Sequence, residues 1–325
     1  MVPVTVAGTI TGALTYTTMG LIALLNTITL EVNDGSTNRY QTNSSGAALM
    51  RRAARILNGY DTATLSALGA NLNAAETASS GSSAGTYNIC IPLLFKHPQI
   101  SDPIGSATML PLPRYNTNPK LTVIFDQLAA AISTNHGATL TIGSPYVIQN
   151  FRQVDNIIFP TLDTQFQEKV VQITGTGANQ NVYLDVPGNY TAIDIYSANS
   201  SGVGADISGG LWFLEILGQT LRSFNLSDVK RQEQFSMGND SYYSKGAGAY
   251  TDLFPGFYHL DFLHDGFGME VGELGSLLNS NVLAGSGSLV QMQMNIGSTG
   301  SVSFAYERIM GDLSPYTLQF NTAAG

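Results

Sequence analysis

Short runs in which apolar and polar residues alternate recur along the whole chain, and Gly, Asn, Asp or Pro bounds each run. A period of two residues is typical of strands that bury one face. The chain is therefore predicted to be mainly β. In the first half the predicted strands are VPVTVAGTI (2–10), NTITLEVND (26–34), TYNICIPLLF (86–95), KLTVIFD (120–126) and ATLTIGSPYVIQNF (138–151).

One segment of the first half has a helical composition instead. SGAALMRRAARILNG (45–59) is rich in Ala, Leu and Arg, with Ser45 placed to cap its start and Asn58-Gly59 placed to end it. We expect a helix there, and a second short helix over 61–78 before the loop SSGSSAGT.

The same order of elements begins again near residue 165. A polar helix is expected over SDVKRQEQFSMG, with Ser227 at its start and Gly238 at its end. The predicted strands of this half are FQEKVVQITG (166–175), YTAIDIYSA (190–198), GGLWFLEILGQTLRSFNL (209–226), GFYHLDFLH (256–264), GSLVQMQMN (287–295) and GSVSFAYERI (300–309).

The two halves also share identical residues at aligned positions. IPLLFKHPQISDPIGS (91–106) aligns without a gap with YHLDFLHDGFGMEVGE (258–273), which places Leu93 on Leu260 and His97 on His264. Together with the matching order of elements, this alignment indicates a tandem duplication of one β domain. We expect the first domain over residues 1–160 and the second over 161–325.

Charge is scarce in this sequence. Charged residues make up 11% of the 325 residues, against about 25% in an average soluble domain. This suggests that other chains cover part of a neutral surface. The net charge of −9 and the lack of a dense basic cluster argue against direct nucleic-acid binding.

Two features bear on compartment and membrane contact. The first thirty residues carry no charge, but they lack a basic leader, and their dense apolar stretch GLIALL is too short to span a bilayer. We expect buried strands there. Cys90, the single cysteine, allows no intrachain disulfide and is expected to be a small buried residue.

The run 258–273 concentrates ionisable side chains. His259 and His264 would face opposite sides of a strand, whereas His259 and Asp261 share a face and could form a general base with an orienting carboxylate. A further set of carboxylates could bind a structural calcium ion, or could serve only turns and contacts with neighbouring chains. These calcium-ligand candidates are Asp265, Glu270 and Glu273.

Other motifs are weaker candidates for a functional site. GSSAG (81–85) fits the nucleophile-elbow pattern around Ser83, but a strand follows it where a helix is required, and no P-loop is present. Arg51, Arg52 and Arg55 are interpreted either as a solvated helix face or as a patch that pairs with a neighbour's carboxylates or acidic lipids. Trp212 is expected in the core, with a sugar-stacking platform as the alternative.

The proline-punctuated IPLLF…MLPLPRYNTNPKLTVIF of the first half and FYHLDFLHDG…ELGSLLNSN…LVQMQMN…GSVSFAYERI of the second resemble double jelly-roll major capsid proteins of icosahedral viruses. That group includes adenovirus hexon and the coat proteins of lipid-containing tectiviruses, corticoviruses and finnlakeviruses. The resemblance implies two tandem eight-stranded jelly-roll barrels or sandwiches, each with a short inserted helix. The family brings no catalytic residues and no cofactor.

The resemblance also implies a function and partners. Homotrimers would form pseudo-hexagonal tiles of a virion shell, assembled in the host cytoplasm, next to other trimers, vertex or penton proteins, minor capsid or membrane proteins and an internal lipid membrane. The chain's 325 residues resemble the length of a phage coat protein more than that of the much larger hexon. The alternatives are a phage spike or fibre module, and an extracellular carbohydrate-binding or glycan-cleaving β-sandwich that would use Asp261 with Glu215 or Glu273.

Overall fold

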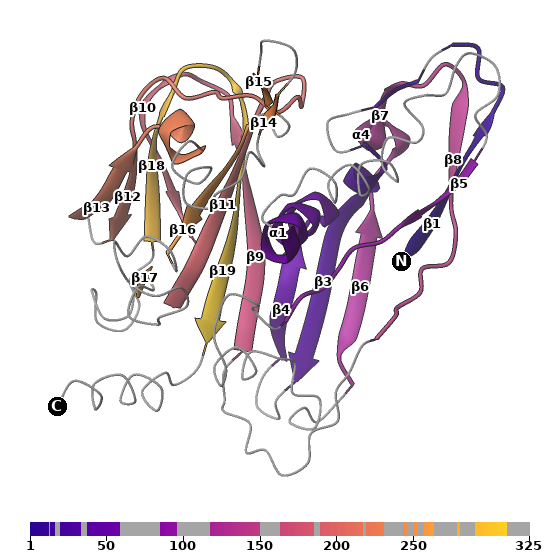
Figure 1. Cartoon of the computed structure of the whole chain (residues 1–325), viewed down its shortest axis with the longest axis horizontal. Coiled ribbons are helices and arrows are strands. Elements are labelled where there is room, and N and C mark those ends of the chain that lie inside the picture. The colour runs from indigo at the N-terminus through magenta and orange to yellow at the C-terminus, as the bar shows by residue number, and fades with distance from the viewer. Residues whose placement is uncertain are drawn as a thin grey trace. The chain divides into compact units, whose positions relative to one another are not determined.

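The computed structural model of the chain describes residues 1–12, 14–16, 20–33, 38–58, 85–95, 118–149, 163–184, 189–216, 219–230, 243–245, 250–252, 256–262, 278–279 and 290–310. Strands dominate these ranges, as the alternating pattern predicts (Figure 1). No helix in these ranges combines the length and the apolar character needed to cross a membrane. The chain forms two compact units, unit 1 (Met1–Leu30, Ser44–Leu94 and Lys120–Phe159) and unit 2 (Glu31–Asn43, Phe95–Pro119 and Pro160–Gly325).

Unit 1 is built around a three-stranded antiparallel sheet in the order β5-β1-β8. In β1, Val2, Val4 and Val6 are buried and alternate with less buried residues, which is the predicted pattern of a half-buried strand. The other described elements of this unit include the pair β2-β7 and the neighbours β3 and β6. The bounds are β1 (Val2–Gly8), β2 (Thr15–Tyr16), η1 (Gly20–Leu24), β3 (Leu25–Asn33, of which the first residues belong to unit 1), α1 (Gly46–Asn58), β5 (Gly85–Ile89), β6 (Lys120–Phe125), α4 (Leu128–Ala131), β7 (Ile132–Thr134) and β8 (Ala138–Ile142).

Unit 2 is a sandwich of two sheets. One sheet has the order β10-β18-β12-β13. The other includes β16-β11-β19-β9-β4, in which β4 runs parallel to β9 and the remaining neighbours are antiparallel. The bounds are β4 (Asn38–Ser44), β9 (Asp163–Ile173), β10 (Gly177–Tyr183), β11 (Asn189–Asn199), β12 (Trp212–Ile216), β13 (Gln219–Phe224), β14 (Tyr243–Lys245), β15 (Tyr250–Asp252), β16 (Phe257–Asp261), β17 (Leu278–Asn279), β18 (Val290–Ile296) and β19 (Gly300–Met310).

The core of unit 2 lies between these two sheets. Trp212 of β12 is fully buried and its ring centroid lies 6.3 Å from that of Phe304 of β19, on the facing sheet. Every second residue of β18, from Val290 to Ile296, adds to the same cluster. The prediction that Trp212 is a core residue is confirmed, since a buried ring offers no platform to a sugar.

The N-terminal cap of α1 is also confirmed. The N–H of Ala48 donates to the Oγ of Ser45 at 3.2 Å, and the N–H of Leu49 donates to the Ser45 carbonyl oxygen at 3.1 Å. A serine in this position satisfies donors that the first turn of a helix leaves open. The second helix expected over 61–78 lies outside the described residues.

Several local expectations need correction. GLIALL does not extend a strand: η1 is a 3-10 helix, although Leu21, Ile22 and Leu24 are buried as expected. The stretch 209–226 is two strands, β12 and β13, paired as a hairpin with Ile216 opposite Gln219. The helix of unit 2 begins at residue 226 rather than at Ser227, because Asn225 supplies the first accepting carbonyl to Val229.

The aligned windows of the two halves differ in structure over the positions that are described in both, 91–95 and 258–262. Residues 258–261 belong to β16, whereas 91–94 form no strand, because β5 already ends at Ile89. Alternation in TYNICIPLLF therefore overestimated the length of this strand. The strands β4 and β10, rich in Asn and Gln, were missed for the opposite reason, since their sequences show no apolar alternation.

Candidate functional site

The buried histidine of β16 is the most chemically distinctive group in the described residues. His259 lies opposite Asp194 of β11 in the antiparallel register, and Nδ1 of the ring donates to Oδ1 of the carboxylate. The two side chains are 1% and 3% exposed. Tyr258 and Leu260 alternate with His259 and belong to the core cluster, so the pair lies on the other face of the sheet.

This pair corrects the expected partner of His259. Asp261 was the predicted orienting carboxylate, but the register places Asp261 opposite Ala192, two residues further along the strand. Asp194 was not singled out from the sequence. The available signal was its place in the apolar run YTAIDIYSA, where a carboxylate on a buried strand requires a hydrogen-bonding partner. Because both groups are enclosed, the arrangement stabilises the sheet and gives no access to a substrate.

The same face of this sheet carries further polar contacts. Ser303 of β19 donates from Oγ to Oε1 of Glu168 on β9. Thr191 of β11 donates from Oγ1 to the carbonyl oxygen of Glu307 at 3.3 Å. Each contact joins neighbouring strands of unit 2, so these side chains reinforce strand pairing.

A buried arginine lies at the end of the core face. Arg308 is 0% exposed, and its Nη2 donates to Oε1 of Gln165 at 2.7 Å and to Oε1 of Gln167 at 3.3 Å. Its guanidinium carbon also lies 5.5 Å from the ring centroid of Tyr306 and 6.0 Å from that of Tyr190. The planar guanidinium group suits stacking on aromatic rings and hydrogen bonds to two amides at once.

The carboxylates of the glycan-cleaving alternative do not assemble into a described site. Glu215 is buried on β12 and accepts a hydrogen bond from Oγ1 of Thr220 on the adjacent β13, at 3.2 Å. Asp261 belongs to β16 in the other sheet of unit 2, and Glu273 lies outside the described residues. Glu215 is therefore a cross-strand contact of the hairpin.

The calcium candidates Asp265, Glu270 and Glu273 lie outside the described residues, as do His264 and Ser83. Within the part of the chain that the structure describes, no three His, Cys, Asp or Glu side chains gather as a metal-binding group. The calcium hypothesis stays a prediction.

Two expectations about unit 1 side chains are wrong for Arg51, Arg52 and Cys90, whereas the side chain of Arg55 lies outside what the structure describes. Arg51 and Arg52 of α1 are 4% and 3% exposed, and Nη1 of Arg52 donates to the carbonyl oxygen of Leu94 at 2.8 Å, so they do not form a solvated face. Cys90, the residue that follows the last residue of β5, is exposed rather than buried.

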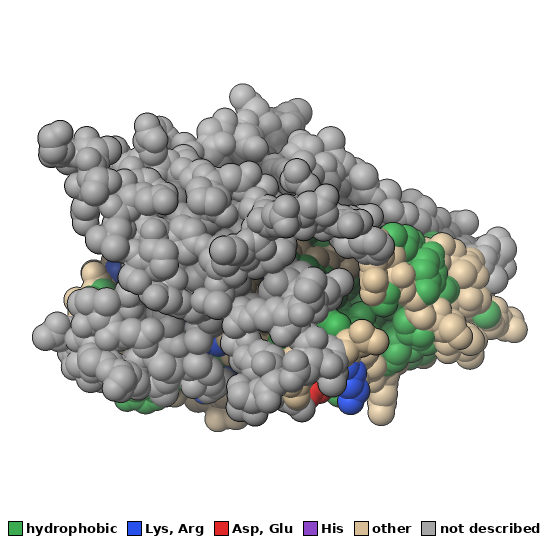
Figure 2. All heavy atoms as spheres, turned by 90° about the horizontal axis from the view of Figure 1, so that it is seen from below, with side chains coloured by type: hydrophobic (Ala, Val, Ile, Leu, Met, Phe, Trp, Pro, Cys, Tyr) green, Lys and Arg blue, Asp and Glu red, His purple; other side chains and the backbone are tan. Residues whose placement is uncertain are grey.

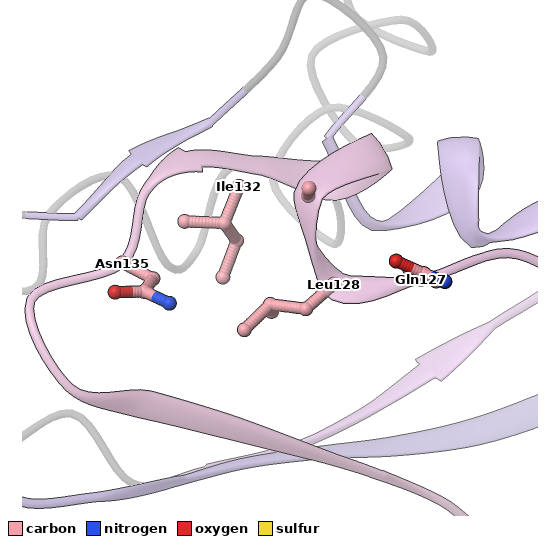
Figure 3. A pocket seen from close by; sticks show the side chains of 5 residues that line it. Gln127, Leu128, Ile132 and Asn135 are labelled. Carbon is pink, nitrogen blue, oxygen red and sulfur yellow. The ribbon is translucent and has the colours of Figure 1, made fainter.

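An open depression lies beside α4 and β7 in unit 1. It has a volume of about 380 Å³ and is lined by Gln127, Leu128, Ala129, Ile132 and Asn135 (Figure 3). Figure 3 shows the apolar Leu128 and Ile132 between the carboxamides of Gln127 and Asn135. None of these five side chains titrates, so the depression offers neither a general acid nor a general base.

No protein-family model and no curated protein matches this sequence. Solved structures do match. The crystal structure of the STIV MCP aligns at 13% identity over 94% of this chain and 86% of its own, with a TM-score of 0.50. PBCV-1 VP54, in a structure fitted into a reconstruction of the virophage Sputnik, aligns at 13% identity over 95% and 85%, with a TM-score of 0.52.

The major capsid protein P2 from bacteriophage PM2 also aligns, at 14% identity over 95% of this chain and 86% of its own, with a TM-score of 0.44. At such identities the likeness concerns the fold. The predicted fold class is confirmed: the chain is mainly β and has the double jelly-roll fold of the STIV MCP and PBCV-1 VP54.

Proposed function

We propose that the protein is the major structural subunit of an icosahedral virion shell and performs no catalysis. The observation that carries the proposal is the likeness in fold to the STIV MCP and PBCV-1 VP54, which extends over 94% and 95% of the chain. Likeness over a single domain would be weaker support, because one jelly roll serves many functions.

The chemistry of the described side chains supports the same function. The most distinctive ionisable pair, His259 with Asp194, is enclosed, and Glu215 is held by a neighbouring strand. Polar groups used in this way hold strands together. A shell subunit needs stable sheets and surfaces for its neighbours, whereas a hydrolase needs carboxylates that converge on an open cleft.

We also propose domain boundaries and an assembly for this double jelly roll. Residues 1–160 and 161–325 form one jelly roll each, and three chains associate into a pseudo-hexagonal tile. Tiles then contact other tiles, vertex proteins and minor capsid or membrane proteins, above an internal lipid layer of a phage. A charged content of only 11% suits a subunit whose surface is largely covered in the assembly.

The mass of the purified protein in solution, followed by negative-stain imaging, tests the function. The subunit of 34.5 kDa should be found as a trimer, with hexagonal tiles or closed shells at high concentration. A protein that stays monomeric at every concentration would contradict the proposal. Trimers that form neither tiles nor shells would favour a spike or fibre module instead.

The glycan-cleaving alternative has its own test. Asp261→Asn should leave the mass of the assembly unchanged, and neither form should release reducing sugar from a panel of bacterial glycans. Hydrolysis by the parent protein that disappears in this variant, with assembly intact, would replace a structural function by an enzymatic one.

A further inference from the structure

The three-stranded sheet of unit 1 has an outer face made of small uncharged residues. Because Val2, Val4 and Val6 of β1 point inward, Pro3, Thr5 and Ala7 point outward. The register places Thr5 between Thr86 of β5 and Thr141 of β8.

The hydroxyl groups of Thr5 and Thr86 lie 2.9 Å apart and hydrogen-bond. Ala7 is opposite Thr139 of β8, and Pro3 is opposite Asn88 of β5. Thr86, Asn88, Thr139 and Thr141 are exposed, so the row of threonines and its flanks form one accessible surface of the folded unit. We call these seven residues, 3, 5, 7, 86, 88, 139 and 141, the threonine face.

The lack of charged side chains on this sheet is unusual for a surface in contact with water. The segments 1–8, 85–90 and 138–149 contain no Asp, Glu, Lys, Arg or His. Within the three-stranded sheet, β5 and β8 are edge strands, and soluble proteins commonly protect such edges with charged side chains, lysine above all.

Apolar residues continue the sheet beyond β8. The N-terminal ammonium group of Met1 donates to the carbonyl oxygen of Tyr146 at 2.7 Å, and the N–H of Tyr146 donates to the carbonyl oxygen of Met1 at 3.0 Å, which extends the pairing of β1 and β8. Tyr146, Val147 and Ile148 are 46%, 58% and 64% exposed. In Figure 2 the described surface on the right, the side where Figure 1 draws β1, β5 and β8, is green and tan, with blue and red only at its lower margin.

We propose that the threonine face is a contact surface between copies of this chain, an inference that rests on the proposed shell function. The charge of the chain favours a second copy as the occupant of this face. The chain carries a net charge of −9, so identical molecules repel each other, and like charges placed opposite one another in an interface are costly. A face without charged side chains is where two copies can approach with the smallest penalty.

The chemistry of threonine favours the same occupant. A hydroxyl group both donates and accepts a hydrogen bond, so it can meet an uncharged surface of the same composition without leaving an unpaired group. The β-branched side chain has few rotamers, and fixing it at an interface therefore costs little entropy. A strongly acidic or basic partner would find no opposite charge here.

The test introduces a charge into this face. Thr141→Lys and, separately, Thr139→Lys place an ammonium group on an exposed strand position that tolerates a polar side chain in the isolated subunit. The matched control is Gln172→Lys, an exposed position on β9 of unit 2, which changes the net charge by the same amount. Circular dichroism and thermal unfolding check that all three variants fold, and mass photometry measures their assembly.

The expected result is a shift of both threonine variants to the mass of one chain, 34.5 kDa, while the parent and Gln172→Lys remain oligomeric. If folded Thr141→Lys and Thr139→Lys assemble as the parent does, the threonine face is not the contact, and the shell function is untouched. If the parent itself is a monomer, both proposals are wrong. If the parent floats with neutral phosphatidylcholine vesicles as a monomer and Thr141→Lys does not, the face covers lipid, and the proposed contact between copies is overturned.

Discussion

His259 and Asp194, which lie 65 residues apart in the chain, hydrogen-bond to each other across β16 and β11 with both side chains buried. A histidine so enclosed would be costly without this partner. The pair therefore contributes to the stability of the sheet.

Asp194→Ala is expected to lower the free energy of unfolding by about 3 kcal/mol, because removal of one member of a buried ionisable pair leaves the other without compensation. Urea denaturation followed by circular dichroism measures the change. Gln172→Ala, at an exposed strand position, serves as the control and should stay within about 0.5 kcal/mol of the parent. An Asp194→Ala protein as stable as this control would show that the pair contributes nothing.

Trp212→Ala is expected to cost about 3 to 5 kcal/mol, since it removes a fully buried ring from the contact with Phe304 between the two sheets. Val203→Ala, at a side chain that is 49% exposed, is the comparison. Differential scanning calorimetry should show a large fall in the melting temperature for the first variant alone. Equal melting temperatures would place the core of unit 2 elsewhere.

Ser45→Ala is expected to destabilise the protein by about 1 kcal/mol, because the N–H of Ala48 loses its acceptor at the start of α1. Ser45→Thr keeps the hydroxyl oxygen and should restore most of this loss. The measurement is again the urea midpoint. If the alanine and threonine variants unfold at the same concentration, the cap has no energetic role.

Gly256 and Gly202 form a matched pair, with φ angles of +77° and +76°. At either position, alanine should lower the free energy of unfolding by about 1 to 2 kcal/mol, because its Cβ disfavours a left-handed backbone conformation. At Gly256 the new Cβ would also overlap the carbonyl oxygen of Ser197 and lie 2.6 Å from the backbone nitrogen of Ala205, whereas at Gly202 it meets nothing within 4 Å. Gly256→Ala should therefore be far more destabilising in thermal unfolding, and similar losses for the two variants would contradict this packing.

A calcium ion bound by Asp265, Glu270 and Glu273 remains a hypothesis from sequence. If it is right, millimolar calcium should raise the melting temperature of the parent, and magnesium should do so less, because these carboxylates suit a larger and more flexible coordination shell. Glu270→Gln with Glu273→Gln should abolish the effect. A melting temperature that does not respond to calcium in the parent would eliminate the site.

Local pattern was sufficient wherever neighbours in the sequence decide the conformation. Alternating Val2, Val4 and Val6 predicted a half-buried strand, and Ser45 predicted the start of α1, because backbone dihedral angles and the first turn of a helix depend on residues a few positions away. Where alternation was absent, as in NRYQTNS of β4 and GANQNVY of β10, the strands were missed.

The hydrogen-bond partners and the burial of individual side chains depended on residues far apart in the chain. Cross-strand register joined His259 to Asp194 rather than to Asp261. Tertiary packing enclosed Arg51 and Arg52 of α1 and left Cys90 exposed. The sequence by itself determined a mainly β chain with a helix capped at Ser45. Only the tertiary structure decided which carboxylate meets His259 and that Thr5, Thr86 and Thr141 align in one uncharged row, because these relationships join residues far apart in the chain through strand register, which no local pattern encodes.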